Sequence, residues 1–465
     1  MARFGRIIAI LHSKLSNGER FDEWRRIKNG DARIVIGARS ALFAPIDNIG
    51  IIIIDEEHDS SYKSETTPKY DARDVAKRIG KAYNSCIVLG SATPDIRSYY
   101  NAIQNKEIKL LQLNERISSY GLPKVQIIDM RNELANGNKT VFSRALYDEI
   151  QKNLDSKEQT ILFLNRRGYS TFVMCRDCGY VVKCDNCDVS MTYHITRNKL
   201  ICHYCGFEKK PVSICPQCGS NNIRYFGTGT QKIETQINKF FPNASVIRMD
   251  VDTTQTKNAH EIILNKFKNE KIDILLGTQM ITKGHDFSNV TLVGVLAADS
   301  SINIGDYRAE ERTFQLLTQV AGRSGRGDKI GRAIIQTYMP DDFSIQMAQK
   351  QDYISFYKQE IKVREKLNYP PFCDIIIAVI VGEKENEVIE DANKIYNIFK
   401  EHFEIYAPMP APISKINDLY RWRVLMKAKV DDKTIQQINF CLDNFQRVKN
   451  ADTKLNFDIN PNNMS

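Results

Sequence analysis

Short apolar runs alternate with longer amphipathic stretches along the first part of the chain. The runs at 33–37, 51–55 and 86–90 are rich in Ile and Val and are separated by stretches with helical spacing. Such runs are typical of parallel strands that are buried on both faces. The pattern therefore predicts an α/β unit over about residues 1–120, with a parallel sheet covered on both faces.

The same alternation returns after a polar segment. Residues 121–142 are rich in Asn, Gly and charge, which predicts a linker. A second α/β unit is predicted over residues 143–345, with a helix at about 143–153 and strands at 160–164, 245–249, 272–276 and 290–297. The long gap between the first two of these strands indicates an insertion.

The character of the chain changes again near residue 346. A polar helix is predicted to end at about Leu367, and the breaker Tyr369-Pro-Pro-Phe372 precedes an apolar run at 375–381. These features predict a small α/β domain over residues 346–465.

The insertion holds eight of the eleven cysteines, and all eight lie in Cys-x-x-Cys pairs. Two such pairs form a closed tetrahedral thiolate site, which is typical of structural Zn²⁺ and leaves no open position for catalysis. We therefore expect two zinc ions within residues 170–225, although spacing alone leaves open which pairs share a metal. The ligands would be Cys175, Cys178, Cys184, Cys187, Cys202, Cys205, Cys215 and Cys218.

Composition narrows the class of protein only slightly. No apolar run reaches about 18 residues, so we expect no membrane span. The N-terminus lacks a small-residue cleavage signal, and the paired cysteines favour a reducing compartment, so a cytoplasmic protein is expected. The net charge of +9 permits a polyanionic partner without requiring one.

The second apolar run ends in the acidic motif Asp55-Glu56-Glu57-His58. Asp55 at the carboxyl end of a strand can hold the Mg²⁺ of a nucleotide, and Glu56 can orient the attacking water. The alternative is a plain strand followed by an acidic turn. The four isoleucines before the motif and the histidine within it favour the nucleotide site.

Two loops of the second unit carry further candidate chemistry. In Gln319-Val-Ala-Gly-Arg323-Ser-Gly-Arg326 two arginines three residues apart can stabilise charge on a transferring phosphoryl group. The alternative is a solvated basic loop. The loop after residue 277 presents Lys283, either to a phosphate backbone or simply to solvent.

The acidic motif, the loop after residue 277 and the arginine motif follow one another along the chain as the motifs of superfamily-2 helicases do, and they resemble those motifs. With two zinc sites inserted in the second unit, the chain is most similar to the bacterial replication-restart (primosomal) helicases of the PriA family. Supporting stretches are Val35-Ile-Gly-Ala-Arg39-Ser40, Tyr70-Asp-Ala-Arg73 and Tyr369-Pro-Pro-Phe372. The resemblance implies two RecA-like lobes, the first of them incomplete, and an ATP-driven 3′–5′ DNA helicase that binds stalled forks and helps to reload the replicative helicase.

The resemblance also implies roles for particular residues. Asp55, Glu56, Arg323 and Arg326 would be catalytic, and the nucleotide site would further include Glu57, His58 and Gln319. DNA would contact Tyr62, Lys63, Tyr70 and Lys283, the first three in a loop that couples single-stranded DNA to ATP hydrolysis.

Cofactors and partners follow from the same resemblance. It implies ATP, Mg²⁺ and two zinc ions, with one zinc on the outer cysteine pairs and one on the inner pairs. It also implies fork DNA, single-stranded DNA, primosome proteins and single-strand-binding protein as partners.

The phosphate-binding loop of such a motor is missing from the sequence. No Gly-x-x-x-x-Gly-Lys-Ser/Thr occurs, and the one Gly-Lys, at Gly80-Lys81, precedes an alanine. We therefore expect a helicase that is truncated at its N-terminus, with an N-terminal fragment encoded upstream as its partner. The alternative is a zinc-containing fragment that binds DNA or a partner and does not turn over ATP on its own.

Overall fold

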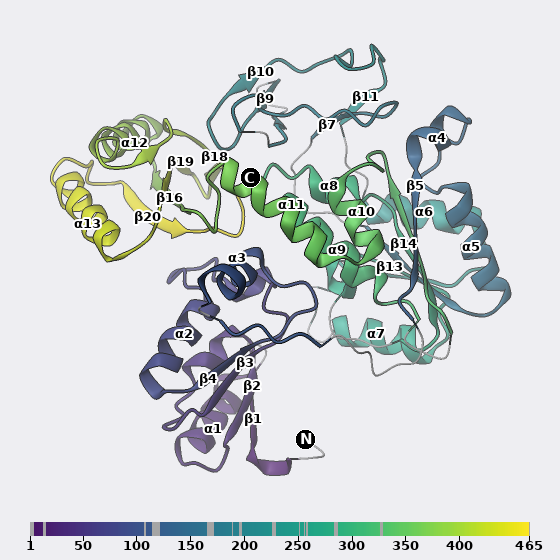
Figure 1. Cartoon of the computed structure of the whole chain (residues 1–465), viewed down its shortest axis with the longest axis horizontal. Helices are drawn as coiled ribbons and strands as arrows, with labels where there is room; N and C mark the ends of the chain where they lie inside the picture. Colours follow the sequence, from purple (N-terminus) through teal and green to yellow (C-terminus); the bar gives the residue numbers. More distant parts are fainter. Residues whose placement is uncertain are drawn as a thin grey trace. The chain divides into compact units, whose positions relative to one another are not determined.

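The structure is a computed structural model. It describes residues 4–12, 15–106, 108–113, 121–164, 172–187, 189–194, 198–225, 229–250, 252–254, 256, 259–282, 287–325 and 329–464. The chain divides into two compact units, each traced in Figure 1. The first unit holds Met1–Lys109 and Asp458–Asn462, and the second holds Leu110–Phe457 and Asn463–Ser465.

The first unit is built from short parallel strand pairs and amphipathic helices. β1 pairs with β2 and β3 pairs with β4, and the predicted runs at 33–37, 51–55 and 86–90 are confirmed as β2, β3 and β4. The elements are η1 (Gly5–Ile7), β1 (Ile8–Leu11), α1 (Asn17–Lys28), β2 (Ile34–Gly37), η2 (Arg39–Phe43), β3 (Ile51–Ile54), η3 (Ser60–Tyr62), α2 (Ala72–Tyr83), β4 (Cys86–Leu89), α3 (Ile96–Tyr100) and the π-helical turn η4 (Asn101–Asn105).

The expectation of a sheet covered on both faces is wrong for this unit. Ile52 and Ile54 of β3 are buried and cluster with Ala76 of α2, whereas Ile51 and Ile53 are 55% and 66% exposed. An all-apolar run hides this difference, because successive side chains of a strand point to opposite faces and only one face here is packed against a helix.

The second unit is centred on a six-stranded parallel sheet with the order β12-β13-β6-β14-β15-β5. Helices α5 and α6 lie on one side of the strands and α9 and α10 on the other (Figure 1). The elements are β5 (Lys124–Asp129), α4 (Met130–Ala135), α5 (Arg144–Asp155), β6 (Gln159–Phe163), α6 (Thr230–Phe240), β12 (Val246–Met249), α7 (Ala259–Asn269), β13 (Ile274–Gly277), η5 (Gln279–Thr282), β14 (Val290–Val295), α8 (Asp299–Ile302), α9 (Ala309–Ala321), β15 (Arg332–Thr337) and α10 (Phe343–Lys350).

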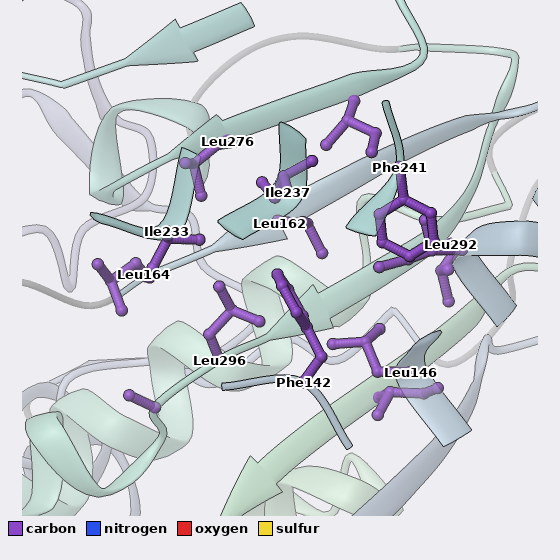
Figure 2. Packing of buried hydrophobic residues seen from close by; sticks show 14 residues of the cluster. Phe142, Leu146, Leu162, Leu164, Ile233, Ile237, Phe241, Leu276, Leu292 and Leu296 are labelled. Carbon is purple, nitrogen blue, oxygen red and sulfur yellow. The ribbon is translucent and has the colours of Figure 1, made fainter. Parts of the chain in front are cut away.

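One face of this sheet forms a close-packed apolar core. Leu146 of α5 and Ile237 of α6 are fully buried and meet Leu162 and Leu292 of the central strands (Figure 2). The helix predicted at 143–153 is α5. It begins at the N-cap Ser143, whose hydroxyl accepts a hydrogen bond from the amide of Leu146.

Residues 121–142 are not a plain linker. They contribute β5, which pairs in parallel with β15 at the edge of the sheet, and α4 directly after it. The sequence Lys-Val-Gln-Ile-Ile-Asp is a short strand bounded by charges, and the Asn- and Gly-rich residues around it masked this pattern.

The cysteine segment adds small antiparallel ribbons between β6 and α6. β7 pairs with β11, and β8, β9 and β10 form a three-stranded sheet. Their bounds are β7 (Val173–Cys175), β8 (Thr192–His194), β9 (Lys199–Ile201), β10 (Glu208–Lys209) and β11 (Ile223–Tyr225).

The C-terminal part forms an antiparallel sheet covered by two long helices. The predicted polar helix ends at Lys366, and the apolar run at 375–381 is confirmed as β16. The sheet order is β17-β19-β16-β20, with β18 paired to β19. The elements are α11 (Tyr353–Lys366), β16 (Asp374–Gly382), α12 (Glu385–Phe399), β17 (Glu404–Ile405), β18 (Met409–Ile416), β19 (Leu419–Ala428), α13 (Asp432–Gln446) and β20 (Lys454–Ile459). None of the helices within the described ranges is long and apolar enough to cross a membrane.

Candidate functional site

Two groups of four sulfurs gather within the cysteine segment. Cys175, Cys178, Cys215 and Cys218 form the outer group, and Cys184, Cys187, Cys202 and Cys205 form the inner group. In each group the sulfurs lie within 4.8 Å of one another. The nested pairing that the resemblance implied is therefore confirmed.

The sulfur spacing fits zinc. The Sγ atoms of Cys175 and Cys218 are 3.7 Å apart, and those of Cys184 and Cys205 are 3.6 Å apart. A tetrahedron with Zn–S bonds of about 2.3 Å has edges of about 3.8 Å. All eleven cysteines are free thiols, so the pairs are available as ligands.

Glycine closes three of the four Cys-x-x-Cys turns. Gly179, Gly206 and Gly219 each follow the second cysteine of a pair, adopt positive φ and donate their amide to the carbonyl of the first cysteine. A Cβ on Gly179 would also clash with the carbonyl oxygen of Tyr338, so this turn sits directly against the end of β15. The Cys-x-x-Cys-Gly signal was present in the sequence.

The two metal centres have different surroundings. Next to the outer centre, Met174 and Val181 pack with Met130 and Tyr338 at the edge of the six-stranded sheet. The inner cysteines belong to an apolar core that they share with the C-terminal domain. Other members of this core are Tyr369, Ile375, Ile377 and Leu425. The inner centre is thus built into the packing of the C-terminal domain.

His194 and His203 are close neighbours of the inner centre, with their Nε2 atoms 3.2 Å apart. Neither belongs to a four-sulfur group of the described residues. The buried Arg423 of β19 donates a hydrogen bond to the carbonyl of His203, which adds a polar contact between the inner centre and the C-terminal sheet.

In the first unit, the acidic motif is hydrogen-bonded to the turn after β4, which has the sequence Gly90-Ser91-Ala92-Thr93. Asp55 follows β3 and is exposed, while Glu57 donates its amide to the carbonyl of Gly90. The Nδ1 atom of His58 lies 2.7 Å from the Ser91 hydroxyl. Glu56 takes a positive φ of 47°, a conformation that is uncommon for residues other than glycine and that sharpens the turn after the strand.

Glu57 is held by its own unit. Its carboxylate accepts hydrogen bonds from the Asp95 amide at 2.7 Å and the Ser98 hydroxyl at 2.9 Å. The pKa of Glu57 is raised from 4.5 to about 7, chiefly by burial and then by the charge of Asp95, against an opposing effect of Arg73. The buried carboxylate therefore serves the packing of this turn, and Asp55 and Glu56 are left as the acids open to a ligand.

This raised pKa predicts a pH-dependent stability. The folded carboxyl keeps a proton that the unfolded one releases above about pH 4.5, so the free energy of unfolding should fall between about pH 4.5 and 7, by up to about 3 kcal/mol. Glu57→Gln should remove that fall, as measured by urea unfolding at pH 5 and pH 8. The exposed Glu65→Gln is the matched control and should keep the wild-type fall; equal behaviour of the two variants would contradict the assignment.

Lys63, which is expected to contact DNA, is held by residues of its own unit. Its side chain is buried, its ammonium is 3.3 Å from Asp458 and it donates to the carbonyl of Ile459 at 2.8 Å. Lys69 also pairs with Asp458, at 2.8 Å. The Lys63 ammonium thus has partners within the first unit.

Tyr62 and Tyr70, also expected to contact DNA, lie in the same loop as Lys63. The Tyr62 hydroxyl donates to the carbonyl of Asp55 at 2.7 Å, and the Tyr70 ring packs edge-on against Phe43 at 5.2 Å. The loop from 59 to 73 returns to the acidic motif at Arg73, which forms two hydrogen bonds with the Asp71 carboxylate and donates to the carbonyl of Glu57. Lys283 lies outside the described residues.

In the second unit, Gln319 lies in the last turn of α9, and Arg323 follows the end of that helix. The Arg323 side chain is only 8% exposed. Arg326 lies outside the described residues.

An unpredicted cluster of buried charges anchors the start of α9. Arg364 of α11 binds Glu311 at 2.7 Å and Glu360 at 2.8 Å, and all three side chains are 3% exposed. Nearby, the hydroxyl of Tyr204, in the inner zinc turn, accepts a hydrogen bond from the amide of Tyr307. The helix that carries Gln319 is therefore bound to α11, and the residues just before this helix are bound to the inner zinc turn.

Three sequence profiles match the chain. The PriA DNA helicase Cys-rich region domain covers residues 184–210, which include the four inner cysteines. The helicase conserved C-terminal domain covers 217–328, and the primosomal protein N C-terminal domain covers 365–462.

Full-length relatives extend this similarity to nearly the whole chain. "Replication restart protein PriA" of Bacillus subtilis (strain 168) is 47% identical over 464 residues, 99% of this chain and 58% of that protein. The same-named protein of Treponema pallidum (strain Nichols) is 38% identical over 96% of this chain and 67% of its own length. The chain belongs to the PriA family.

Membership in the PriA family confirms the resemblance and the fold class predicted from the motifs. The chain is a relative of replication-restart helicases, with RecA-like lobe architecture and two four-cysteine clusters that bind zinc. It spans little more than half the length of the Bacillus subtilis PriA. Among solved structures, RecG bound to a three-way DNA junction is 13% identical with a TM-score of 0.39, over 78% of this chain and 40% of RecG.

Proposed function

We propose that the chain is the core of an ATP-dependent 3′–5′ DNA helicase that binds stalled forks and helps to reload the replicative helicase. The observation that carries the proposal is the acidic turn after β3, with Asp55 exposed and His58 bonded to Ser91 of the neighbouring turn. A shift of one turn on nucleotide binding would be transmitted to the other. The partners would be fork and single-stranded DNA, primosome proteins and single-strand-binding protein, in the bacterial cytoplasm.

The proposal assigns separate roles to the residues at the nucleotide and to those at the DNA. Asp55 would hold Mg²⁺, which supplies charge neutralisation on the phosphates of ATP, and Glu56 would orient the attacking water. Gln319, Arg323 and Arg326 would contact the nucleotide from the second lobe. Tyr62 and Tyr70 would stack on bases of single-stranded DNA, a contact worth about 1–3 kcal/mol per base. Lys283 would contact a DNA phosphate.

The missing phosphate-binding loop sets the expected activity of these 465 residues. Without its lysine and backbone amides, the β- and γ-phosphates lose most of their clamp. The purified chain should therefore hydrolyse ATP at a rate close to the uncatalysed background, with or without single-stranded DNA. Robust DNA-stimulated ATPase from this chain alone would contradict the expectation.

The test of the helicase proposal adds a separately expressed segment that carries a phosphate-binding loop. DNA-stimulated hydrolysis should appear in the mixture and should be lost again with Glu56→Gln. DNA binding with no hydrolysis in any mixture would favour the second candidate function, a zinc-containing DNA- or partner-binding fragment. The two compact metal centres, which need no nucleotide for their packing, favour that alternative.

A further inference from the structure

A basic pocket lies between α4 and the outer metal centre. Its volume is about 530 Å³, and Arg131, Lys139, Arg176, Asp177 and Asn222 line it together with Leu134 and Ala135. The pocket follows the carboxyl end of β5, the edge of an α/β sheet where ligands usually bind. All its walls belong to the second compact unit.

The outer zinc turn presents Arg176 to this pocket. Arg176 and Asp177 are the two middle residues of the Cys175–Cys178 pair, so the four-sulfur site fixes their backbone. The Arg176 guanidinium donates to the Tyr338 hydroxyl from Nε at 3.0 Å and from a terminal nitrogen at 2.6 Å. Its position is therefore set by a neutral partner, which orients the charge without cancelling it.

The charges of the pocket are unequal. Neither Arg176 nor Lys139 forms an ion pair within the described residues, whereas Arg131 pairs with Asp129 at 2.8 Å and with Asp341 at 3.5 Å. The one lining carboxylate, Asp177, already accepts hydrogen bonds from Ser220 and Asn222. The pocket therefore holds two cations without an ion-pair partner, Arg176 and Lys139, and one carboxylate that already accepts hydrogen bonds. This balance of charge favours an anion.

We propose that this pocket is a phosphate-binding site for the backbone of DNA, with Arg176 and Lys139 as its contact residues. The proposal rests on the proposed function, in which the chain binds DNA. An arginine that is held in place and only partly buried matches the tetrahedral oxygens of a phosphate and can donate two parallel hydrogen bonds to it. Because phosphate contacts carry no base information, the site should act on any sequence.

The test is DNA binding measured as a function of salt. A labelled oligo(dT) strand and the intact 465-residue chain are titrated by fluorescence anisotropy between about 0.05 and 0.3 M NaCl. Removing one phosphate contact lowers the slope of log K against log salt by about 0.7 and weakens binding about fivefold at about 0.1 M. R176Q combined with K139Q should therefore lower the slope by about 1.4 and the affinity by about 25-fold.

Two further variants separate the pocket from general effects of charge or folding. Tyr338→Phe keeps every charge but removes the acceptor that orients Arg176, so it should give a smaller loss of affinity than R176Q with K139Q. Arg447→Gln removes an exposed arginine at the end of α13. It should change the affinity for oligo(dT) by no more than about twofold. Native mass spectrometry should find the same zinc content in every variant.

The outcomes distinguish this site from the proposed function. If the wild-type chain binds oligo(dT) and the double variant binds it with unchanged affinity and slope, the pocket proposal fails and DNA binding stands. If the wild-type chain binds no DNA, both fail. A poly-Glu peptide is titrated in the same way. If the double variant loses the binding of this peptide but keeps that of oligo(dT), the pocket binds an acidic protein segment and the DNA assignment is overturned.

Discussion

Cys202→Ser is expected to destabilise the C-terminal domain, whereas Cys218→Ser is expected to leave that domain intact. Each change should release one zinc, and structural zinc contributes about 10–16 kcal/mol in small zinc-binding peptides. The consequences differ because Cys202 is fully buried in a core shared with Ile375, Ile377 and Leu425. Cys218 is exposed at the outer centre.

Amide hydrogen exchange resolves this difference along the chain, since it reports local opening. In Cys202→Ser the amides of β16 and β19 should exchange much faster than in wild type. In Cys218→Ser, faster exchange should be confined to the strands β7 and β11 and the edge of the six-stranded sheet. Equal loss of protection in β16 and β19 for both variants would show that the inner centre has no special connection to the C-terminal sheet.

Arg364→Met is expected to lower the free energy of unfolding of the second unit by about 3–5 kcal/mol, because it leaves two buried carboxylates without their partner. Arg364 and its partners Glu311 and Glu360 are almost fully buried. Burial alone already raises the pKa of Glu360, and the Arg364 charge opposes that rise. Thermal and urea unfolding measure the loss.

An exposed ion pair and a compensated variant provide the controls. Lys152→Met removes a lysine that is 64% exposed beside Glu149, and such pairs contribute less than about 1 kcal/mol. Replacing Glu311 and Glu360 by leucine together with Arg364→Met removes the unpaired charges and should recover most of the lost stability. A mild effect of Arg364→Met alone, or a triple variant as unstable as the single one, would contradict the role of this cluster.

Local sequence patterns predicted the parts of the structure that depend on near neighbours. The strands β3 and β16 follow from their apolar runs, and the zinc turns follow from their Cys-x-x-Cys spacing. The sheet order and the exposed face of β3 could not be read in this way, because they depend on which elements pack together in space.

Contacts between residues far apart in the sequence account for the remaining differences. A lysine in this loop suggested a DNA contact. In the structure Lys63 pairs with Asp458, which lies almost at the other end of the chain. Arg364 and Glu311 come from separate helices whose sequences give no sign of a shared buried site. The basic pocket likewise joins α4, expected to be linker, with a zinc turn that appeared purely structural.

The zinc content of the purified wild-type chain, measured by native mass spectrometry, tests the two-centre structure most directly. We expect two zinc ions per chain, with one remaining after loss of either the Cys175/Cys178 pair or the Cys184/Cys187 pair. One zinc or none in the wild-type chain, or loss of both ions from a single pair replacement, would contradict this expectation.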